Sequence, residues 1–314
     1  MSVEPALLAG ETAAPPPKRG MPGRLARDGG ILFGAVIILF MVLIGIAAPW
    51  LGTKNPSEIN PAFRNRVPGI EQTIRNDDGT TRTFTYRMGT DSLGRDIYSR
   101  VIYGARVSLA VGLFSAAVAG ASGVAIGGIA GYVGGAVDAV LMRSTDAMLA
   151  IPRLPLLMIA AVVLQPSIPS LIVLIGLAGW METARVVRAE FRALRGKGFV
   201  ENARAAGASH ARVLVRHLLP NAAQAVAVSL TLAVARGILL ESALSFFGVG
   251  VRPPAASWGN MLYQAQAALA TEPWLAIAPG AFILMTTVSV SLIGDRLAGP
   301  PSYDGAHHYS ITGR

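Results

Sequence analysis

Residues 31–51 read ILFGAVIILFMVLIGIAAPWL, a run of 21 residues without a charged side chain. The hydrocarbon core of a bilayer is about 30 Å thick, so an α-helix needs about 20 apolar residues to cross it. This stretch therefore predicts a membrane-spanning helix. A signal peptide is not expected here, because the apolar run is too long and the 30 residues before it are too many for a basic leader.

The rest of the chain has the same apolar character. Of its 314 residues, 52% are hydrophobic and only 14% are charged, whereas a soluble domain carries about 25% charged residues. So much apolar surface needs lipid around it as well as a protein core. The apolar runs are continuous rather than alternating, which excludes a β-barrel. The composition predicts an all-α polytopic membrane protein and excludes fibrous, disordered and small secreted classes.

The net charge and the numbers of cysteine and histidine residues exclude several classes of function. A net charge of +9 is explained by basic loops on the cytoplasmic side of a membrane, so no nucleic-acid partner is expected. The chain has no cysteine, which excludes disulfides, thiolate nucleophiles and cysteine-ligated metals. Its four histidines form no spaced ligand set apart from a terminal pair, His307 and His308, so no metal site is expected.

Uncharged runs predict six membrane-spanning helices in all. The third and fourth share residues 147–181, and the third begins near Val140. The turn between them is expected at Gln165, Pro166, Ser167 and Pro169. The other four spans are expected at residues 31–51, 107–137, 218–247 and 273–294.

The remaining segments follow from these spans. The alanine and proline run at residues 13–17 predicts that residues 1–30 form a disordered tail. Residues 52–104 are expected to form an extracytoplasmic loop, residues 105–298 the transmembrane core, and residues 299–314 a second tail. Within this core, residues 185–220 form the main cytoplasmic loop.

The distribution of lysine and arginine predicts the orientation, because basic residues in short loops remain in the cytoplasm. Eight lie in the segment between the fourth and fifth spans and four in the N-terminal tail, whereas the segment between the fifth and sixth spans has only Arg252. Residues 54–106 carry nine but are long and rich in acidic residues, and such segments translocate with less regard to charge. Both termini are therefore expected in the cytoplasm, and residues 60–86 outside it.

Small residues recur at intervals of four along the second predicted span. Such a ridge allows another helix to approach closely, since packing drives helix association in lipid. A contact within the chain is favoured over a seam between subunits, and both remain open. The residues of the ridge are Ser115, Ala119, Gly123, Gly127, Gly131 and Gly135.

The most informative cytoplasmic stretch is GFVENARAAGASHARVLVRHLLPN, residues 198–221. Good helix formers from Glu201 to Ala206 predict a short helix, and Gly207 is placed to end it in a left-handed conformation. Ser209 is placed to cap a second helix. The product is a helix, a defined turn and another helix.

This stretch resembles the EAA loop of binding-protein-dependent ABC importer permeases. In that loop Glu-Ala-Ala is followed by a glycine and then by Leu-Pro. Asn202 replaces the middle alanine here, and His217 stands where the general pattern has isoleucine. The positions that match are Glu201, Ala203, Gly207, Leu219 and Pro220.

The resemblance implies that the loop is a coupling helix that seats in an ATPase subunit. The residues expected to serve the coupling are Glu201, Asn202, Ala203, Ala206, Gly207, Ser209, Leu219 and Pro220.

Two further stretches narrow the resemblance. Residues 88–109, beginning MGTDSLGRDIYSR, look like the entry to the second helix of dipeptide and oligopeptide permeases of the "C" type. Residues 241–262, which begin ESALSFFGVG and end SWGNML, are similar to the outer loop after their fifth helix. Three motifs in the family's order imply the six-helix type I fold of ABC importer permeases.

The resemblance also implies the partners and the cargo. It implies a subunit of a bacterial inner-membrane importer for dipeptides or oligopeptides, with a homologous second permease, two ABC ATPase subunits and an extracytoplasmic solute-binding protein. The chain has no Gly-x-x-x-x-Gly-Lys-Ser/Thr loop, so ATP and magnesium are expected in the partner ATPases. No catalytic triad or carboxylate pair is apparent, and no enzymatic activity is expected.

Two charges fall inside the fifth predicted span. Arg236 lies midway along it and Glu241 lies near its outer end, and charges inside a membrane are functional candidates by default. They are expected either to line a translocation pathway and meet the termini of a peptide, or to pair with each other or with the partner permease. A second pair, Arg143 with Asp146, is expected to be structural.

Other functions remain open at this point. Related importers carry nickel, opines or other small solutes. An ion-driven secondary transporter or channel would explain Arg236 without an ATPase, although the chain shows no inverted repeat. A membrane assembly protein without transport is a third alternative.

Overall fold

The computed structural model describes residues 28–75, 80–164 and 167–298. The expected tails before residue 28 and after residue 298 lie outside this part, as do Gln165 and Pro166 of the expected turn. Four described helices are long and apolar enough to cross a membrane. They are α2 (Gly29–Ala47), α3 (Ile97–Val133), α11 (Ala223–Phe246) and α13 (Trp274–Ala298).

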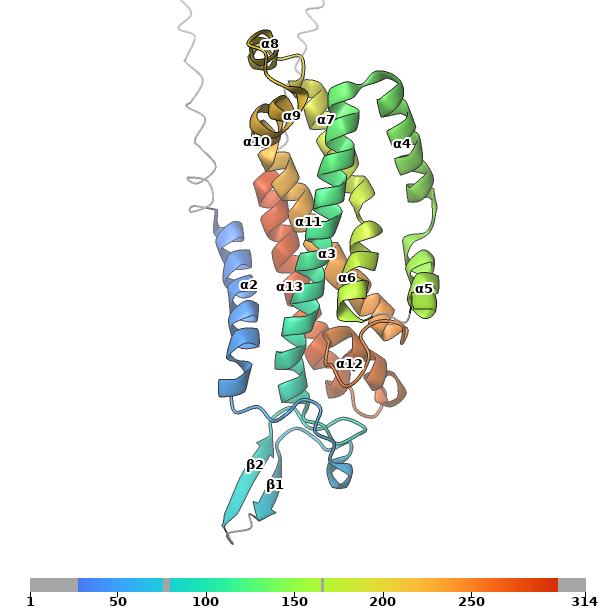
Figure 1. Cartoon of the computed structure of the whole chain (residues 1–314). Helices are drawn as coiled ribbons and strands as arrows, with labels where there is room; N and C mark the ends of the chain where they lie inside the picture. Colours follow the sequence, from blue (N-terminus) through green and yellow to red (C-terminus); the bar gives the residue numbers. More distant parts are fainter. Residues whose placement is uncertain (1–27, 76–79, 165–166, 299–314) are drawn as a thin grey trace, which may run out of the picture.

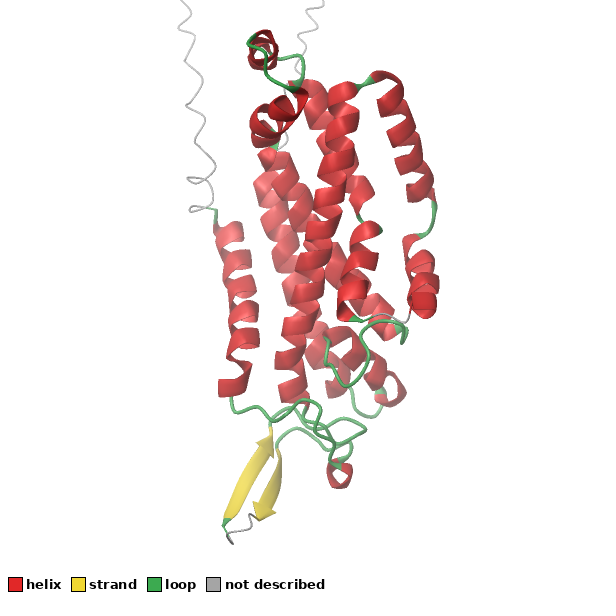
Figure 2. Cartoon of the chain, viewed as in Figure 1, coloured by secondary structure: helices red, strands yellow, loops and turns green. Residues whose placement is uncertain are grey.

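Two further spans are each bent pairs of helices. α4 (Gly135–Ala150) and α5 (Arg153–Leu164) meet at 82°, and α6 (Ile168–Leu177) and α7 (Trp180–Leu194) meet at 44°. Counting each pair as one span gives up to six spans in the described part of the chain. The prediction of an all-α polytopic membrane protein is confirmed for this core (Figures 1 and 2).

The second span begins ten residues before the expected Val107, at Ile97. The expected start directly follows the last charged residue before the uncharged run. The helix in fact starts earlier, because the charged side chains in its first turns have hydrogen-bond partners. Arg106 donates to the carbonyl of Ile46 at 3.1 Å and also to that of Gly45, at the end of α2. The span ends at Val133 because Gly134 has a φ of +74°, a conformation that favours glycine.

Both bends lie where a helix is interrupted by proline or glycine. Pro152 precedes α5, and a proline lacks the backbone N–H that a continuous helix would use. Gly179 separates α6 from α7. Of the expected turn between the third and fourth spans, Ser167 caps α6 by accepting from the Ser170 N–H.

The small-residue ridge is a seam within the chain, which confirms the favoured alternative. α3 packs along α6 and α7, and side chains on three glycines of α3 would collide with α7. A Cβ on Gly123 would lie 2.7 Å from the Trp180 carbonyl oxygen, and one on Gly131 would lie 2.6 Å from that of Arg188. A Cβ on Gly127 would overlap the Ala184 backbone. Gly135 is not part of the seam, because it begins α4 and faces open space.

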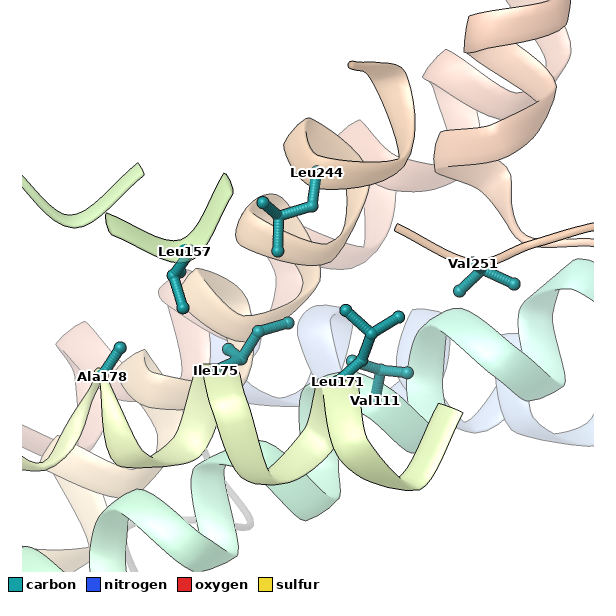
Figure 3. Close-up of a cluster of buried hydrophobic side chains, with 7 residues drawn as sticks. All are labelled: Val111, Leu157, Leu171, Ile175, Ala178, Leu244 and Val251. Carbon is teal, nitrogen blue, oxygen red and sulfur yellow. The ribbon is translucent and has the colours of Figure 1, made fainter. Parts of the chain in front are cut away.

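An apolar cluster packs between four helices of the bundle. It joins α3, α5, α6 and α11 to the loop after α11 (Figure 3). Its fully buried or nearly buried members are Val111, Leu157, Leu171, Ile175, Ala178, Leu244 and Val251. These contacts hold the bent spans against the straight ones.

The segment between α2 and α3 contains strands that the all-α expectation lacked. β1 (Ile70–Arg75) and β2 (Thr81–Tyr86) form an antiparallel hairpin at one end of the molecule (Figure 2). The short helix η1 (Ala48–Trp50) follows α2 directly, and η2 (Pro61–Phe63) lies between η1 and the hairpin. Between α11 and α13 lie α12 (Trp258–Ala265) and η4 (Gln266–Ala268).

The opposite end carries the remaining helices. These are α8 (Gly198–Ala205), α9 (His210–Arg212), η3 (Val213–Leu218) and α10 (Leu219–Asn221). Asp28, at the start of α2, lies 3.3 Å from Arg296 near the end of α13. The first and last described spans therefore end on one face, the face of α8 in Figure 1.

We expect Gly127→Leu to lower the free energy of unfolding by about 1–3 kcal/mol, because overpacking a tight contact forces backbone shifts. The thermal unfolding midpoint of the purified protein in detergent measures this. Gly280→Ala is the matched control, since a Cβ there meets nothing within 4 Å. Equal midpoints for both variants and the wild type would contradict the α3–α7 seam.

Candidate functional site

Residues 198–221 form an element that projects beyond the helical bundle, and we call it the coupling element (Figure 1). α8 ends in a Schellman motif: the Ala208 N–H donates to the Ala203 carbonyl at 3.0 Å, and the Gly207 N–H to that of Arg204 at 2.9 Å. Gly207 has a φ of +77°. Ser209 then caps the next helix by accepting from the Arg212 N–H. The predicted helix, left-handed glycine and cap are all confirmed.

The coupling element is anchored by one apolar side. Val200 of α8 is fully buried in a cluster with Phe191 of α7, Val213 and Leu218. By contrast, most of the residues expected to contact an ATPase face outward. Ala203 and Leu219 are half-buried, and the exposed ones are Glu201, Asn202, Ala206, Gly207, Ser209 and Pro220.

Tyr132 links the coupling element to the membrane core, and sequence reasoning missed it. It lies at the end of α3, and its hydroxyl is 2.7 Å from Nδ1 of His210. The guanidinium of Arg204 lies over its ring at 4.9 Å. Arg204 and His210 lie 72 and 78 positions after Tyr132 in the sequence, so no local pattern brings them together with it.

The second half of the coupling element leads into α11. Residues 210–221 are helical, with a π-helical segment at Val213–Leu218 in which the Leu219 N–H donates to the Leu214 carbonyl. Pro220 follows directly and has no N–H to donate, so the regular α-helical bonding is interrupted here. A short but irregular stretch of helix therefore links α9 to α11.

The structure pairs the intramembrane charges differently from the expectation. Arg236 lies 2.6 Å from Glu182 of α7, and Glu182 also lies 2.9 Å from Arg153 at the start of α5. The alternative of an Arg236–Glu241 pair is therefore wrong. The expected Arg143–Asp146 pair is also wrong, because Asp146 pairs with Arg185 of α7 at 2.5 Å. Both partners come from another span, which sequence spacing along one helix does not reveal.

Glu241 is fully buried, so its carboxylate has no exposed surface in this structure. Its carboxylate accepts from Ser245 at 2.8 Å and from Ser108 of α3 at 3.1 Å. The Ser108 hydroxyl in turn accepts from the backbone N–H of Trp258 at 3.2 Å. Glu241 thus holds α12 against α3 and α11.

Two of the stretches that carried the family resemblance meet at the end of the bundle that carries the hairpin (Figure 1). Arg95 lies 2.7 Å from Asp91 and donates to Gln264 of α12 at 2.6 Å. The indole N–H of Trp258 donates to the Val101 carbonyl at 3.0 Å. Nearby, burial raises the pKa of Asp96, which caps α3, while hydrogen bonds from Ser99 lower it. The N-terminal end of α3 is therefore fastened to α12 by buried polar contacts.

A cleft of about 480 Å³ opens between α7 and α11. It runs from the charged pair at Glu182 and Arg236 toward Asn221, at the coupling element. The residues that line it include Val186 and Glu190 on α7 and Val228 and Leu232 on α11. Among the described residues no group of three or more histidine, aspartate or glutamate side chains is placed to hold a metal ion.

The sequence of residues 123–299 matches the family model described as "Binding-protein-dependent transport system inner membrane component". The chain belongs to this family. The match covers more than half of the chain, including the glycines of the ridge, the coupling element, the cleft and α13.

Relatives in the family match nearly the whole chain. A protein of Brucella abortus biovar 1, named as a permease of a peptide transport system, is 37% identical over 278 residues, 87% of this chain and 88% of its own. A peptide permease protein of Brucella suis biovar 1 is 34% identical over 277 residues, 87% of each chain. The dipeptide transport system permease protein DppC of Alkalihalophilus pseudofirmus is 32% identical over 300 residues, 93% of this chain and 94% of its own.

Family membership assigns the general role. The chain is a multi-pass inner-membrane permease component of an ABC transport system and is not itself a catalytic subunit. The alternatives of an ion-driven transporter and of an assembly protein without transport are therefore overturned.

We expect Gly207→Val to loosen the turn of the coupling element in this permease. A left-handed conformation costs other residues about 1–2 kcal/mol, so the amides of residues 206–209 should exchange hydrogen about 5 to 30 times faster. Gly207→Asn is the matched control, because asparagine tolerates this conformation and a Cβ at Gly207 meets nothing within 4 Å. Hydrogen–deuterium exchange with mass spectrometry measures the difference; unchanged exchange in the valine variant would contradict the motif's role.

Proposed function

We propose that the chain is the membrane-spanning permease subunit of an ATP-driven importer of dipeptides or oligopeptides. Its cargo would be delivered by an extracytoplasmic solute-binding protein. The relatives are named as peptide and dipeptide permeases, which supports peptides over nickel, opines or another small solute as the cargo. Family membership supports dependence on a binding protein.

The coupling element is the observation that carries this proposal. Its exposed residues, headed by Glu201 and Asn202, sit on a capped helix beyond the bundle, while Val200 anchors that helix to α7. Such a surface suits a partner that must push on the permease without contacting its core. We propose that two ABC ATPase subunits bind ATP and magnesium and that one of them seats on this surface.

Movement would pass from the coupling element to the membrane along two connections. One runs from His210 and Arg204 to Tyr132 and so to α3. The other runs through residues 213–221 into α11. Since α3 and α7 are locked by the glycine seam, the motion proposed is a rigid-body change between two access states.

A homologous second permease would complete the pathway. Arg236 lines the open cleft between α7 and α11, which supports its place in that pathway. Glu241 is withdrawn from it because of its burial.

A charge reversal at the coupling surface tests the proposal. We expect Glu201→Lys to weaken ATPase association and to abolish peptide uptake by the reconstituted complex. Glu71→Lys makes the same reversal at an exposed position of the outer hairpin and should leave ATPase association unchanged. Co-purification of the ATPases and peptide-stimulated hydrolysis in proteoliposomes measure both. Normal association and stimulation in Glu201→Lys would place the coupling contact elsewhere.

The orientation is tested by single cysteines, which the natural sequence lacks. An impermeant thiol reagent applied to intact cells should label Arg82→Cys on the hairpin but not Gly198→Cys on the coupling element. The reason is the basic bias of the coupling loop and the shared face of Asp28 and Arg296. Both positions should label after the cells are opened. External labelling of Gly198→Cys in sealed cells would reverse the assigned orientation of both termini.

A further inference from the structure

Arg153, Glu182 and Arg236 form a charged triad where three spans meet. Arg153 begins α5 just after the bend of one span, and Glu182 lies in the first turn of α7 just after the bend of the other. Arg236 is 13 residues into α11, about 20 Å along a helix that rises 1.5 Å per residue. The triad therefore sits at depth in the spanning region.

The triad carries more positive than negative charge. Two guanidinium groups share the single carboxylate of Glu182, at 2.9 Å from Arg153 and 2.6 Å from Arg236. Within the described residues, neither arginine has a second carboxylate partner at ion-pair distance. The triad thus has one positive charge more than it has negative charges, and leaving that charge unpaired at this depth costs free energy. Binding of a second carboxylate at this place would therefore be favoured.

The cleft gives such a carboxylate access to Arg236. Arg236 and Glu182 both line it, whereas Arg153 does not. From Glu182 to Glu190 the cleft follows eight residues of α7, about 12 Å at 1.5 Å per residue. An extended peptide spans about 3.3–3.6 Å per residue, so three residues fit along this length.

We propose that Arg236 binds the C-terminal carboxylate of the transported peptide, and that Glu182 holds this place when no peptide is present. On binding, Arg236 exchanges Glu182 for the peptide, and Glu182 stays paired with Arg153. Each charged group of the triad then has one partner of opposite charge. This inference rests on the proposed peptide transport and identifies a residue that selects the cargo.

A permanent structural lock between the two bent spans is the competing explanation. It predicts that losing either Arg236 or Glu182 impairs transport of all peptides alike. The binding proposal predicts opposite effects of the two changes on one ratio, the uptake of a peptide with a free C-terminus over that of its C-terminal amide. The binding protein itself can prefer one of the two peptides, but this preference is the same for every permease variant. It therefore cancels when the uptake ratios of the variants are compared.

The experiment measures this ratio at low peptide concentration in proteoliposomes that contain the whole complex. In Arg236→Gln we expect the ratio to fall by about fivefold, the upper end for a partly exposed ion pair. In Glu182→Gln it should rise, because Arg236 loses its competitor. Arg185→Gln is the matched control, since Arg185 pairs with Asp146 outside the cleft, and it should leave the ratio unchanged.

Each outcome decides a separate point. Peptide uptake by the wild type with the same ratio in all three variants would overturn the carboxylate site and leave the proposed function standing. No peptide uptake by an assembled wild-type complex would remove the proposed function and this inference with it. If Arg236→Gln fails to assemble, Glu182→Gln decides alone: a raised ratio supports the site, and an unchanged or lowered ratio overturns it.

Discussion

The close contact between α3 and α7 is the constraint on which the rest of the structure depends. Gly123, Gly127 and Gly131 have no Cβ, so the backbone of α7 lies directly on α3. In lipid, where apolar surface drives no association between helices, such packing is a main source of stability. The seam makes the two helices one body.

This body joins both ends of the permease. At the end that carries the coupling element, α3 supplies Tyr132 for His210, and α7 leads into that element. At the opposite end, α3 is fastened to α12 through Trp258. The body formed by α3 and α7 therefore connects the coupling element with α12.

The charges inside the spanning region serve two different purposes. Glu241 is fully buried and accepts hydrogen bonds from serines of two helices, as expected for a group that fastens helices together. Glu182 and Arg236 instead border an open cleft, and their charges do not balance those around them. Glu241 is therefore a structural charge, whereas Glu182 and Arg236 are the charges for which we propose a role in binding the cargo.

The sequence by itself determined the features that depend on local or periodic properties. Length and hydrophobicity predicted the spans, the interval of four predicted the seam, and the left-handed Gly207 with the Ser209 cap predicted the turn of the coupling element. Only the tertiary structure decided the partners of Arg236, Asp146 and Tyr132, together with the burial of Glu241. Those contacts join residues tens of positions apart, and they depend on how far each span bends and turns. Hydrophobic pattern and spacing along one helix carry no such information, because they describe which face is apolar and not which residue of another helix lies opposite.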